Sequence, residues 1–172
     1  MQNYTTHTIE NAPPAARPVL EAVKAKMGFV PNLMATMAES PVLVESYLTM
    51  MTLFDKTALT ETERQIILMT NNRLNGCTYC MAAHTAVSQR AGVDDAIIEA
   101  LRVFAIIVHR SRGRPTPEQI DAFLAAGYTK QTVLEVIVGT SLKVLSNYTT
   151  PITQPSLDKA FSSVAWSEDM AS

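Results

Sequence analysis

The sequence of 172 residues contains only two cysteines, Cys77 and Cys80, which lie three positions apart. A secreted domain held by disulfides spreads more cysteines over a shorter chain. Two cysteines so close together cannot join distant segments, so a structural cross-link explains the pair poorly. A role in chemistry explains it better.

Long apolar stretches, a basic excess and a secretory signal are also missing. No stretch approaches the ~18 continuous apolar residues of a membrane-spanning helix, and MQNYTTHTIENAPP at the start lacks the basic and apolar regions of a signal peptide. The net charge is −2, whereas nucleic-acid binders are usually basic. We therefore expect a cytoplasmic protein without nucleic-acid or membrane partners, in a compartment that keeps thiols reduced.

Charged residues are scarce at 17%, whereas hydrophobic residues make up 47% of the sequence. A chain of this length buries about two thirds of the surface that its unfolded form exposes, which is enough for an ordinary core. We expect a single domain over residues 1–172, because no linker, repeat or low-complexity segment interrupts the chain. The low charge indicates that another subunit covers part of the apolar surface.

Helix signals recur along the chain and strand signals do not. Capping residues, prolines and glycines divide it into amphipathic segments with apolar residues every three or four positions. The pattern predicts an all-α bundle of about six to eight helices. The expected helices cover residues 19–27, 33–39, 41–54, 60–74, 77–91, 94–105, 116–126 and 129–146.

The last of these helices is apolar on most sides, so it must be central to the core or to a subunit interface. Gly139 and Ser141 within it would allow a neighbour to approach closely. Residues 109–115, HRSRGRP, are expected to form a solvated basic loop, with binding of an anion as the alternative. The tail beyond Pro151 is short and polar, with Trp166 as a candidate anchor.

The residues Cys77, Cys80 and His84 lie three and four positions apart, so a helix places them on one face. Both sulfurs then lie in the first turn, where free N–H groups and the helix dipole favour a thiolate. A thiolate attacks peroxides, and a second thiol can condense with the resulting sulfenic acid. His84 is placed to move the protons that these steps need.

The same three residues also fit roles without redox chemistry. The cysteine pair could be accidental, and His84 could be a core histidine with satisfied hydrogen bonds. A structural zinc site would need a fourth ligand, which His7 or His109 would have to supply. The thioredoxin interpretation fails because that motif requires βαβ units around it.

The segment LTETERQIILMTNNRLNGCTYCMAAH, at 59–84, resembles the core of the AhpD-like alkylhydroperoxidases within the carboxymuconolactone decarboxylase superfamily. The similarity extends upstream to GFVPNLMATMAESPVLVESY and downstream to 142–148, with the core motif at about 59–92. The resemblance implies an AhpD-like helical bundle that assembles as a homotrimer or homohexamer. It also implies thiol-dependent reduction of organic hydroperoxides, with no cofactor and no metal.

The resemblance also implies a role for each site residue. Cys80 would be oxidised by the peroxide, and Cys77 would donate a proton and then close a disulfide. His84 would belong to the proton relay. An external dithiol would reduce the disulfide after each cycle.

Position 65 departs from the family pattern. The family relay begins with a glutamate twelve positions before the first cysteine, and this chain has Gln65 there. Glutamine can hydrogen-bond and hold a water, but it cannot accept a proton at neutral pH. Glu61, one turn earlier, could substitute through a water. The residues between the cysteines, Thr78 and Tyr79, differ from the histidine that peroxidatic members can carry, which would make the activity weaker or direct it at another oxidant.

Two rival functions follow. In the first, the protein is a redox-responsive or purely structural oligomer whose cysteine pair senses oxidants without turnover. Gln65 is consistent with this function because it cannot accept a proton at neutral pH. The decarboxylase branch of the superfamily acts on a cyclic lactone acid and has no need of a cysteine pair. The methionines are expected to fill the core or an interface: Met34, Met37, Met50, Met51, Met69 and Met81.

Overall fold

Every regular element of the described structure is helical. The computed structural model describes residues 4–88 and 95–167, and within these ranges it has no strand. The all-α prediction is confirmed. No helix in these ranges combines the length and the apolar character needed to cross a bilayer. The elements are η1 (Pro14–Ala16), α1 (Arg17–Met27), α2 (Asn32–Met37), α3 (Pro41–Phe54), α4 (Glu61–Leu74), α5 (Thr78–Ser88), α6 (Asp95–Ser111), α7 (Pro117–Ala125), α8 (Lys130–Thr153) and η2 (Lys159–Val164).

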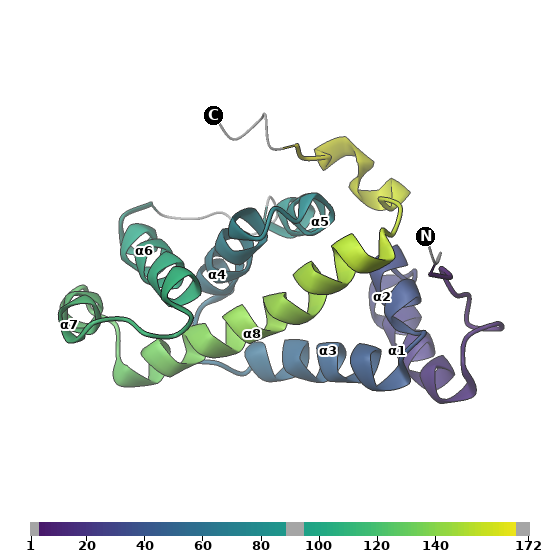
Figure 1. The fold of residues 1–172 in the computed structure, drawn as a ribbon, viewed down its shortest axis with the longest axis horizontal. Coiled ribbons are helices and arrows are strands. Elements are labelled where there is room, and N and C mark those ends of the chain that lie inside the picture. The colour runs from purple at the N-terminus through teal and green to yellow at the C-terminus, as the bar shows by residue number, and fades with distance from the viewer. Residues whose placement is uncertain (1–3, 89–94, 168–172) are drawn as a thin grey trace.

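Helix α8 runs through the middle of the molecule, with α3 on one side and α4 and α6 on the other (Figure 1). The prediction that this helix is central to the core is confirmed. Its buried residues recur every three or four positions, as one face of a helix does. They include Thr132, Val136, Gly139, Lys143 and Ser146.

Gly139 is the point of closest approach between α8 and its neighbours. A Cβ atom at this position would lie 2.7 Å from Cγ2 of Ile67 and 2.8 Å from Cζ of Phe54. Real Cβ atoms do not approach other heavy atoms so closely, because interiors are packed at crystal density. The close approach predicted at Gly139 is therefore confirmed, whereas Ser141 is exposed.

The helix starts follow the capping signals in the sequence. The hydroxyl of Thr60 accepts a hydrogen bond from the backbone N–H of Glu63, and the Glu63 carboxylate accepts one from the N–H of Thr60. This reciprocal pair satisfies two N–H groups that the first turn leaves free. Ser40 and Thr129 cap α3 and α8 in the simpler way, and Gly28 ends α1 with a φ of 83°.

Two predicted helix ends were too early. Helix α6 continues to Ser111, so His109 and Arg110 belong to the helix and not to a basic loop. The apolar stripe through Phe104 and Val108 remains buried and carries the helix onward. Helix α8 continues past Ser146 to Thr153. The predicted helix end at 91 and helix start at 94 lie outside the described residues.

The C-terminal tail is anchored by Phe161 more than by Trp166, the candidate anchor in the sequence. It folds back so that η2 packs on α5, near the upper right of the bundle in Figure 1. Phe161 is the buried residue of this segment, with its ring edge-on to Tyr79 at a centroid distance of 6.3 Å. Trp166 is only partly buried. Leu157, Phe161 and Val164 lie four and three positions apart, so an apolar spacing typical of a helix is present in this segment.

Candidate active site

The two cysteines form the N-terminal turn of α5. Cys77 precedes the helix, and its sulfur accepts a hydrogen bond from the backbone N–H of Cys80 at 3.4 Å. The sulfur thus takes the place of the oxygen that usually caps this position. Both cysteines are buried and free. The predicted placement of both sulfurs in the first turn is confirmed.

Three buried or half-buried asparagines hold this turn against α4 and α8. The side-chain amide of Asn72 donates to the carbonyl of Cys80 at 3.1 Å, and its oxygen accepts from Asn147 at 2.9 Å. Asn75 donates to the oxygen of Asn147 at 2.9 Å. Buried amides need such partners because an unpaired one costs about 1–3 kcal/mol. The network therefore fixes the cysteine turn relative to α8.

The two thiols have opposite acidities. The pKa of Cys80 is lowered to about 6, first by the hydrogen bond that the Cys77 thiol donates and then by the charge of Lys143, although burial acts the other way. The pKa of Cys77 is raised because its proton is held by Cys80 and because it is buried. Cys80 is therefore the thiolate of the pair at neutral pH, and Cys77 carries the proton.

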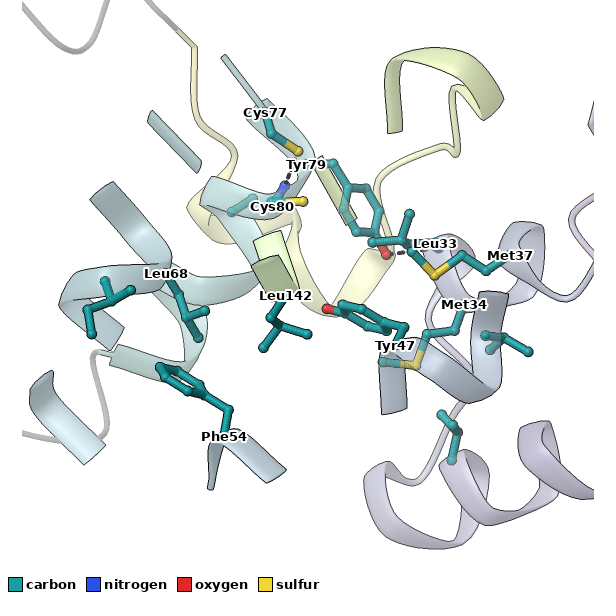
Figure 2. Packing of buried hydrophobic residues seen from close by; sticks show 14 of the residues in the cluster. Leu33, Met34, Met37, Tyr47, Phe54, Leu68, Cys77, Tyr79, Cys80 and Leu142 are labelled. Atoms are coloured by element: carbon teal, nitrogen blue, oxygen red, sulfur yellow. Dashed lines mark hydrogen bonds between the residues drawn. The ribbon is translucent and has the colours of Figure 1, made fainter. Parts of the chain in front are cut away.

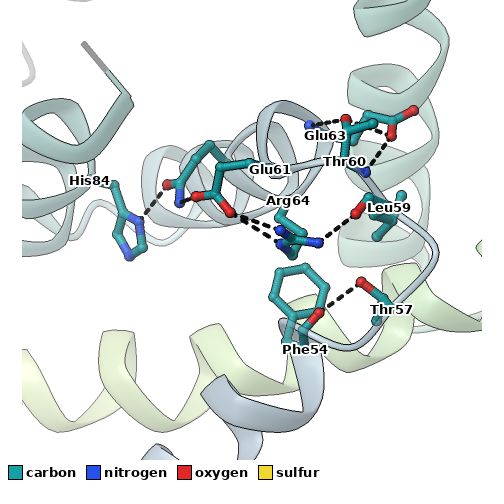
Figure 3. A network of polar contacts seen from close by, with 9 residues as sticks. Phe54, Thr57, Leu59, Thr60, Glu61, Glu63, Arg64 and His84 are labelled. Atoms are coloured by element: carbon teal, nitrogen blue, oxygen red, sulfur yellow. Dashed lines mark hydrogen bonds and ion pairs between the residues drawn. The ribbon is translucent and has the colours of Figure 1, made fainter. Parts of the chain in front are cut away.

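A chain of hydrogen bonds runs from α8 through α5 to α4. Nζ of Lys143 lies 3.1 Å from Nε2 of His84, and Nδ1 of His84 lies 2.9 Å from Oε1 of Gln65. Nε2 of Gln65 donates to Oε1 of Glu61 at 2.8 Å. Figure 3 shows the part of this network that runs from His84 toward Arg64, with Glu61 between these two residues.

The donors and acceptors in this chain can point in one direction only. An ammonium group has no acceptor, so Lys143 donates to His84. The other imidazole nitrogen of His84 then carries the proton and donates to the oxygen of Gln65. Burial and the charge of Lys143 lower the pKa of His84 well below its usual range, so the ring is neutral at neutral pH.

Gln65 reaches the site through its contact with Nδ1 of His84. It contacts Glu61 directly, whereas the sequence suggested that a water would lie between that glutamate and the relay. The pKa of Glu61 is lowered, first by the hydrogen bond from Gln65 and then by Arg64. The carboxylate of the hydrogen-bond network is thus that of Glu61. It lies one residue further along the network from the sulfurs than the glutamate of the family pattern.

Lys143 is the site residue that the sequence did not reveal. Its side chain is 1% exposed, and burial lowers its pKa while the cysteines oppose that shift. The signal was present, because Lys143 occupies the buried stripe of α8 between Gly139 and Ser146. A lysine on such a stripe is rarely buried without a charged or polar partner. What the sequence could not supply was the identity of that partner.

An apolar cavity of about 120 Å³ reaches the reactive groups. Cys80, His84 and Lys143 line one part of it, and the rest of the wall is almost entirely apolar. Figure 2 shows Cys80 together with three of the wall residues, Leu33, Met34 and Tyr47. The remaining wall residues include Met27, Met51, Tyr79 and Phe161. A small apolar molecule would thus lie against the thiolate.

Tyr79, between the two cysteines, connects the turn to the C-terminal tail. Its hydroxyl donates to the carboxylate of Asp158 and accepts from the N–H of Leu33 at 3.2 Å. The same carboxylate accepts from the N–H of Asn32 at 3.1 Å. This buried group therefore joins α5, α2 and the tail.

The alternative zinc ligands lie elsewhere. His7 contacts Glu39 at 2.7 Å, and His109 contacts Asn71 at 3.1 Å. Within the described part of the chain, no three histidine, cysteine or acidic side chains gather as a metal site would require. Of the methionines, Met34, Met37 and Met81 are buried in the core, as predicted.

Residues 44–112, which include both cysteines and His84, match the sequence model of the carboxymuconolactone decarboxylase family. Over this segment the chain is similar to the carboxymuconolactone decarboxylase family. No curated protein sequence is significantly similar to it.

Solved structures show the same fold. A peroxidase-related protein with an AhpD core, from Ralstonia eutropha JMP134, has a TM-score of 0.79 and 22% identity over 92% of this chain and 93% of its own. A peroxidase-related protein from Silicibacter sp. TM1040 has a TM-score of 0.76 and 17% identity over 92% and 93% of the two chains. The debrominase Bmp8, as a C82A variant with 2,3,4-tribromopyrrole, has a TM-score of 0.69 and 17% identity over 88% and 89%. The AhpD-like bundle is thus confirmed.

Proposed function

We propose that this chain is a member of the carboxymuconolactone decarboxylase family and a thiol peroxidase that reduces small organic hydroperoxides through a Cys77–Cys80 disulfide. One observation carries the proposal. A buried thiol whose pKa is lowered, Cys80, lines an apolar cavity and has a protonated thiol, Cys77, one helical turn away. This arrangement supplies a nucleophile, a resolving group and a place for the substrate.

The first step oxidises Cys80. The thiolate attacks the terminal oxygen of the hydroperoxide, the O–O bond breaks, and Cys80 becomes a sulfenic acid while an alkoxide leaves. The alkoxide takes a proton from the ammonium of Lys143, which borders the same cavity. His84 can orient that ammonium because it accepts a hydrogen bond from Nζ.

The second step closes the disulfide. Cys77 gives up its proton and attacks the sulfur of the sulfenic acid, and the hydroxide that leaves is released as water. In sum, two thiols and one hydroperoxide give one disulfide, one alcohol and one water. An external dithiol then returns two electrons and two protons.

The cavity favours a compact and neutral substrate. Its volume of about 120 Å³ is well below the ~300–1,000 Å³ of pockets for drug-sized ligands. The Cys80 thiolate and the Lys143 ammonium together carry no net charge, so a charged substrate would enter without a partner. Short alkyl and aryl hydroperoxides meet these requirements.

Steady-state consumption of tert-butyl hydroperoxide and cumene hydroperoxide in the presence of dithiothreitol tests the proposal. Wild-type protein should turn over, Cys80→Ser should be inactive, and Cys77→Ser should stop after a single oxidation. A wild type that forms the disulfide but does not turn over would instead indicate a redox-responsive protein. Activity that persists in Cys80→Ser would contradict the proposal.

Reductive debromination is a second candidate. The same cavity places a thiolate beside space for a compact ring, and the fold is shared with a debrominase. Cys80 would attack the bromine, the ring carbon would take a proton, and Cys77 would displace bromide as the disulfide forms. Release of bromide from 2,3,4-tribromopyrrole in the presence of dithiothreitol tests this candidate. A protein that reduces hydroperoxides but releases no bromide would exclude debromination.

We also propose that the chain forms a homo-oligomer through the outer side of α8. Large apolar side chains recur there every three to seven positions and are exposed. Sedimentation of wild type and of Leu134→Asp tests this assembly, since the variant should dissociate. The exposed residues are Leu134 (64%), Ile137 (45%), Val144 (38%), Tyr148 (56%) and Ile152 (64%).

A further inference from the structure

The two sulfurs of the site line different pockets. Cys80 lines the apolar cavity of about 120 Å³, and Cys77 does not. Cys77 instead lines a second pocket of about 300 Å³, between the start of α5 and the end of α8, and Cys80 is absent from the residues around it. Tyr79 lines both pockets and therefore forms part of the wall between them.

The second pocket differs from the first in chemistry. Neutral polar groups are frequent around it, among them Asn75, Thr78 and Gln154, and no charged side chain lines it. Amides and hydroxyls bind ligands that carry their own hydrogen-bonding groups. An apolar hydroperoxide would make few hydrogen bonds in this pocket. A polar thiol would make hydrogen bonds with the amides and hydroxyls and would lie beside the sulfur of Cys77.

The wall between the pockets is held firmly. The hydroxyl of Tyr79 is bonded to Asp158 and Leu33, and its ring packs against Phe161. Tyr79 therefore cannot swing aside without leaving a buried carboxylate with one donor fewer. Each pocket thus remains a separate approach to a single sulfur.

We propose that the polar pocket is the docking site of the reducing thiol and that the reductant attacks the sulfur of Cys77. This inference rests on the proposed disulfide cycle. A reductant thiolate bonds to the sulfur of Cys77, the Cys77–Cys80 bond breaks, and its electron pair leaves on Cys80. The second thiol of the reductant then attacks the mixed disulfide, releases Cys77, and leaves with both of its sulfurs oxidised to a disulfide.

The identity of the leaving group supports the same direction. Thiol–disulfide exchange is faster when the departing sulfur has the lower pKa. The charge of Lys143 and the hydrogen bonds of Thr150 and Asn147 lower the pKa of Cys80, and these groups remain in place when Cys77 is in a mixed disulfide. Attack on Cys80 would instead expel Cys77, whose pKa is raised by burial and which has no cation beside it in the way that Cys80 has Lys143.

The two approaches can be blocked separately. Thr78 is exposed beside Cys77, so Thr78→Trp should fill the polar pocket, with Thr78→Ser as the matched control that leaves it open. Met27, 42% exposed, lines the apolar cavity, so Met27→Trp should obstruct that side. Circular dichroism confirms that each variant is folded.

The two half-reactions are then measured apart by stopped flow. Protein oxidised with diamide is reduced by glutathione, and reduced protein is oxidised by tert-butyl hydroperoxide. Thr78→Trp should slow the reduction on the order of tenfold more than it slows the oxidation, and Met27→Trp should show the reverse order. Equal slowing of reduction by both tryptophan variants would overturn the proposal. Because diamide forms the disulfide, this result does not depend on peroxidase activity.

The attacked sulfur can also be identified directly. Diamide-oxidised wild type is mixed with excess glutathione and quenched with iodoacetamide, which caps the sulfur that has left. Peptide mass spectrometry should find glutathione on Cys77 and the carbamidomethyl group on Cys80. The opposite labelling would contradict the assignment, even if the peroxidase proposal holds.

Discussion

Nζ of Lys143 lies 3.1 Å from Nε2 of His84, so a buried ammonium group donates to a neutral imidazole beside the cysteine pair. This contact sets the direction of every hydrogen bond from α8 to Glu61. The cation on α8 favours the Cys80 thiolate although position 65 is a neutral glutamine. The family pattern places a negative charge at position 65 on α4, whereas this site has a neutral amide there and a positive charge on α8.

Lys143→Met should lower thiol reactivity while increasing stability. Loss of the cation raises the pKa of Cys80, so we expect iodoacetamide alkylation at pH 7 to fall on the order of tenfold. The buried ammonium opposes folding, because burial lowers the pKa of Lys143 below its value in the unfolded chain. Urea unfolding at pH 7 measures the stability.

The pH dependence of unfolding gives a second test of Lys143. Between its lowered folded-state pKa and the unfolded value of about 10.4, the unfolded chain binds more protons, so wild-type stability should rise with pH. The methionine variant should lose this slope. Lys130→Met, at an exposed position at the start of α8, serves as the control and should keep it.

The alkylation rate of Cys80 should rise with pH through a midpoint near its pKa of about 6. In Cys77→Ala the thiol that donates to the thiolate is gone, so the midpoint should shift upward toward the ~8.5 of an unperturbed cysteine. Stopped-flow alkylation from pH 4 to 9 measures both midpoints. An unchanged midpoint in Cys77→Ala would show that the hydrogen bond between the thiols does not control the acidity.

Gln65→Glu should raise the pKa of His84, since a carboxylate beside Nδ1 favours the imidazolium. The new carboxylate would also lie against Glu61, which now accepts a hydrogen bond from position 65 at 2.8 Å. The double variant Glu61→Gln/Gln65→Glu removes this repulsion and should show the larger shift. Histidine titration by NMR measures it, and identical titrations in all three proteins would contradict the proposed chain.

Tyr79→Phe should destabilise the protein by about 1–3 kcal/mol, because the buried carboxylate of Asp158 loses a hydrogen-bond donor. The ring packing on Phe161 is kept in this variant. Urea unfolding measures the cost, with Tyr148→Phe at a 56% exposed position as the control. Equal stabilities of the two variants would show that the Tyr79–Asp158 contact does not hold the tail.

Gly139→Ala should cost about 1–3 kcal/mol through overpacking, since its Cβ atom would lie 2.7 Å from Ile67 and 2.8 Å from Phe54. Alanine is the better helix former, so the same change at a helix position without close neighbours would increase stability. Ser141→Ala, at an exposed position on the same helix, is the matched control. A stabilised Gly139→Ala would show that α3 and α4 yield at this contact.

Local signals were enough to predict most helices and the position of the cysteine turn. Capping at Ser40, Thr60 and Thr129 involves residues only three apart, so the sequence contains the whole interaction. The spacing of Cys77, Cys80 and His84 likewise follows from helix geometry. The ends of α6 and α8 were missed because burial against other helices, and not local preference, extends them.

The sequence by itself determined the all-α class, the family resemblance and the cysteine–histidine line on α5, because these depend on residues that are neighbours along the chain. Only the tertiary structure decided which charge stands beside the thiolate. Lys143 lies 59 positions after His84, and Asp158 lies 79 positions after Tyr79. Contacts of that separation arise when α8 and the tail pack on α5, and no local pattern contains them.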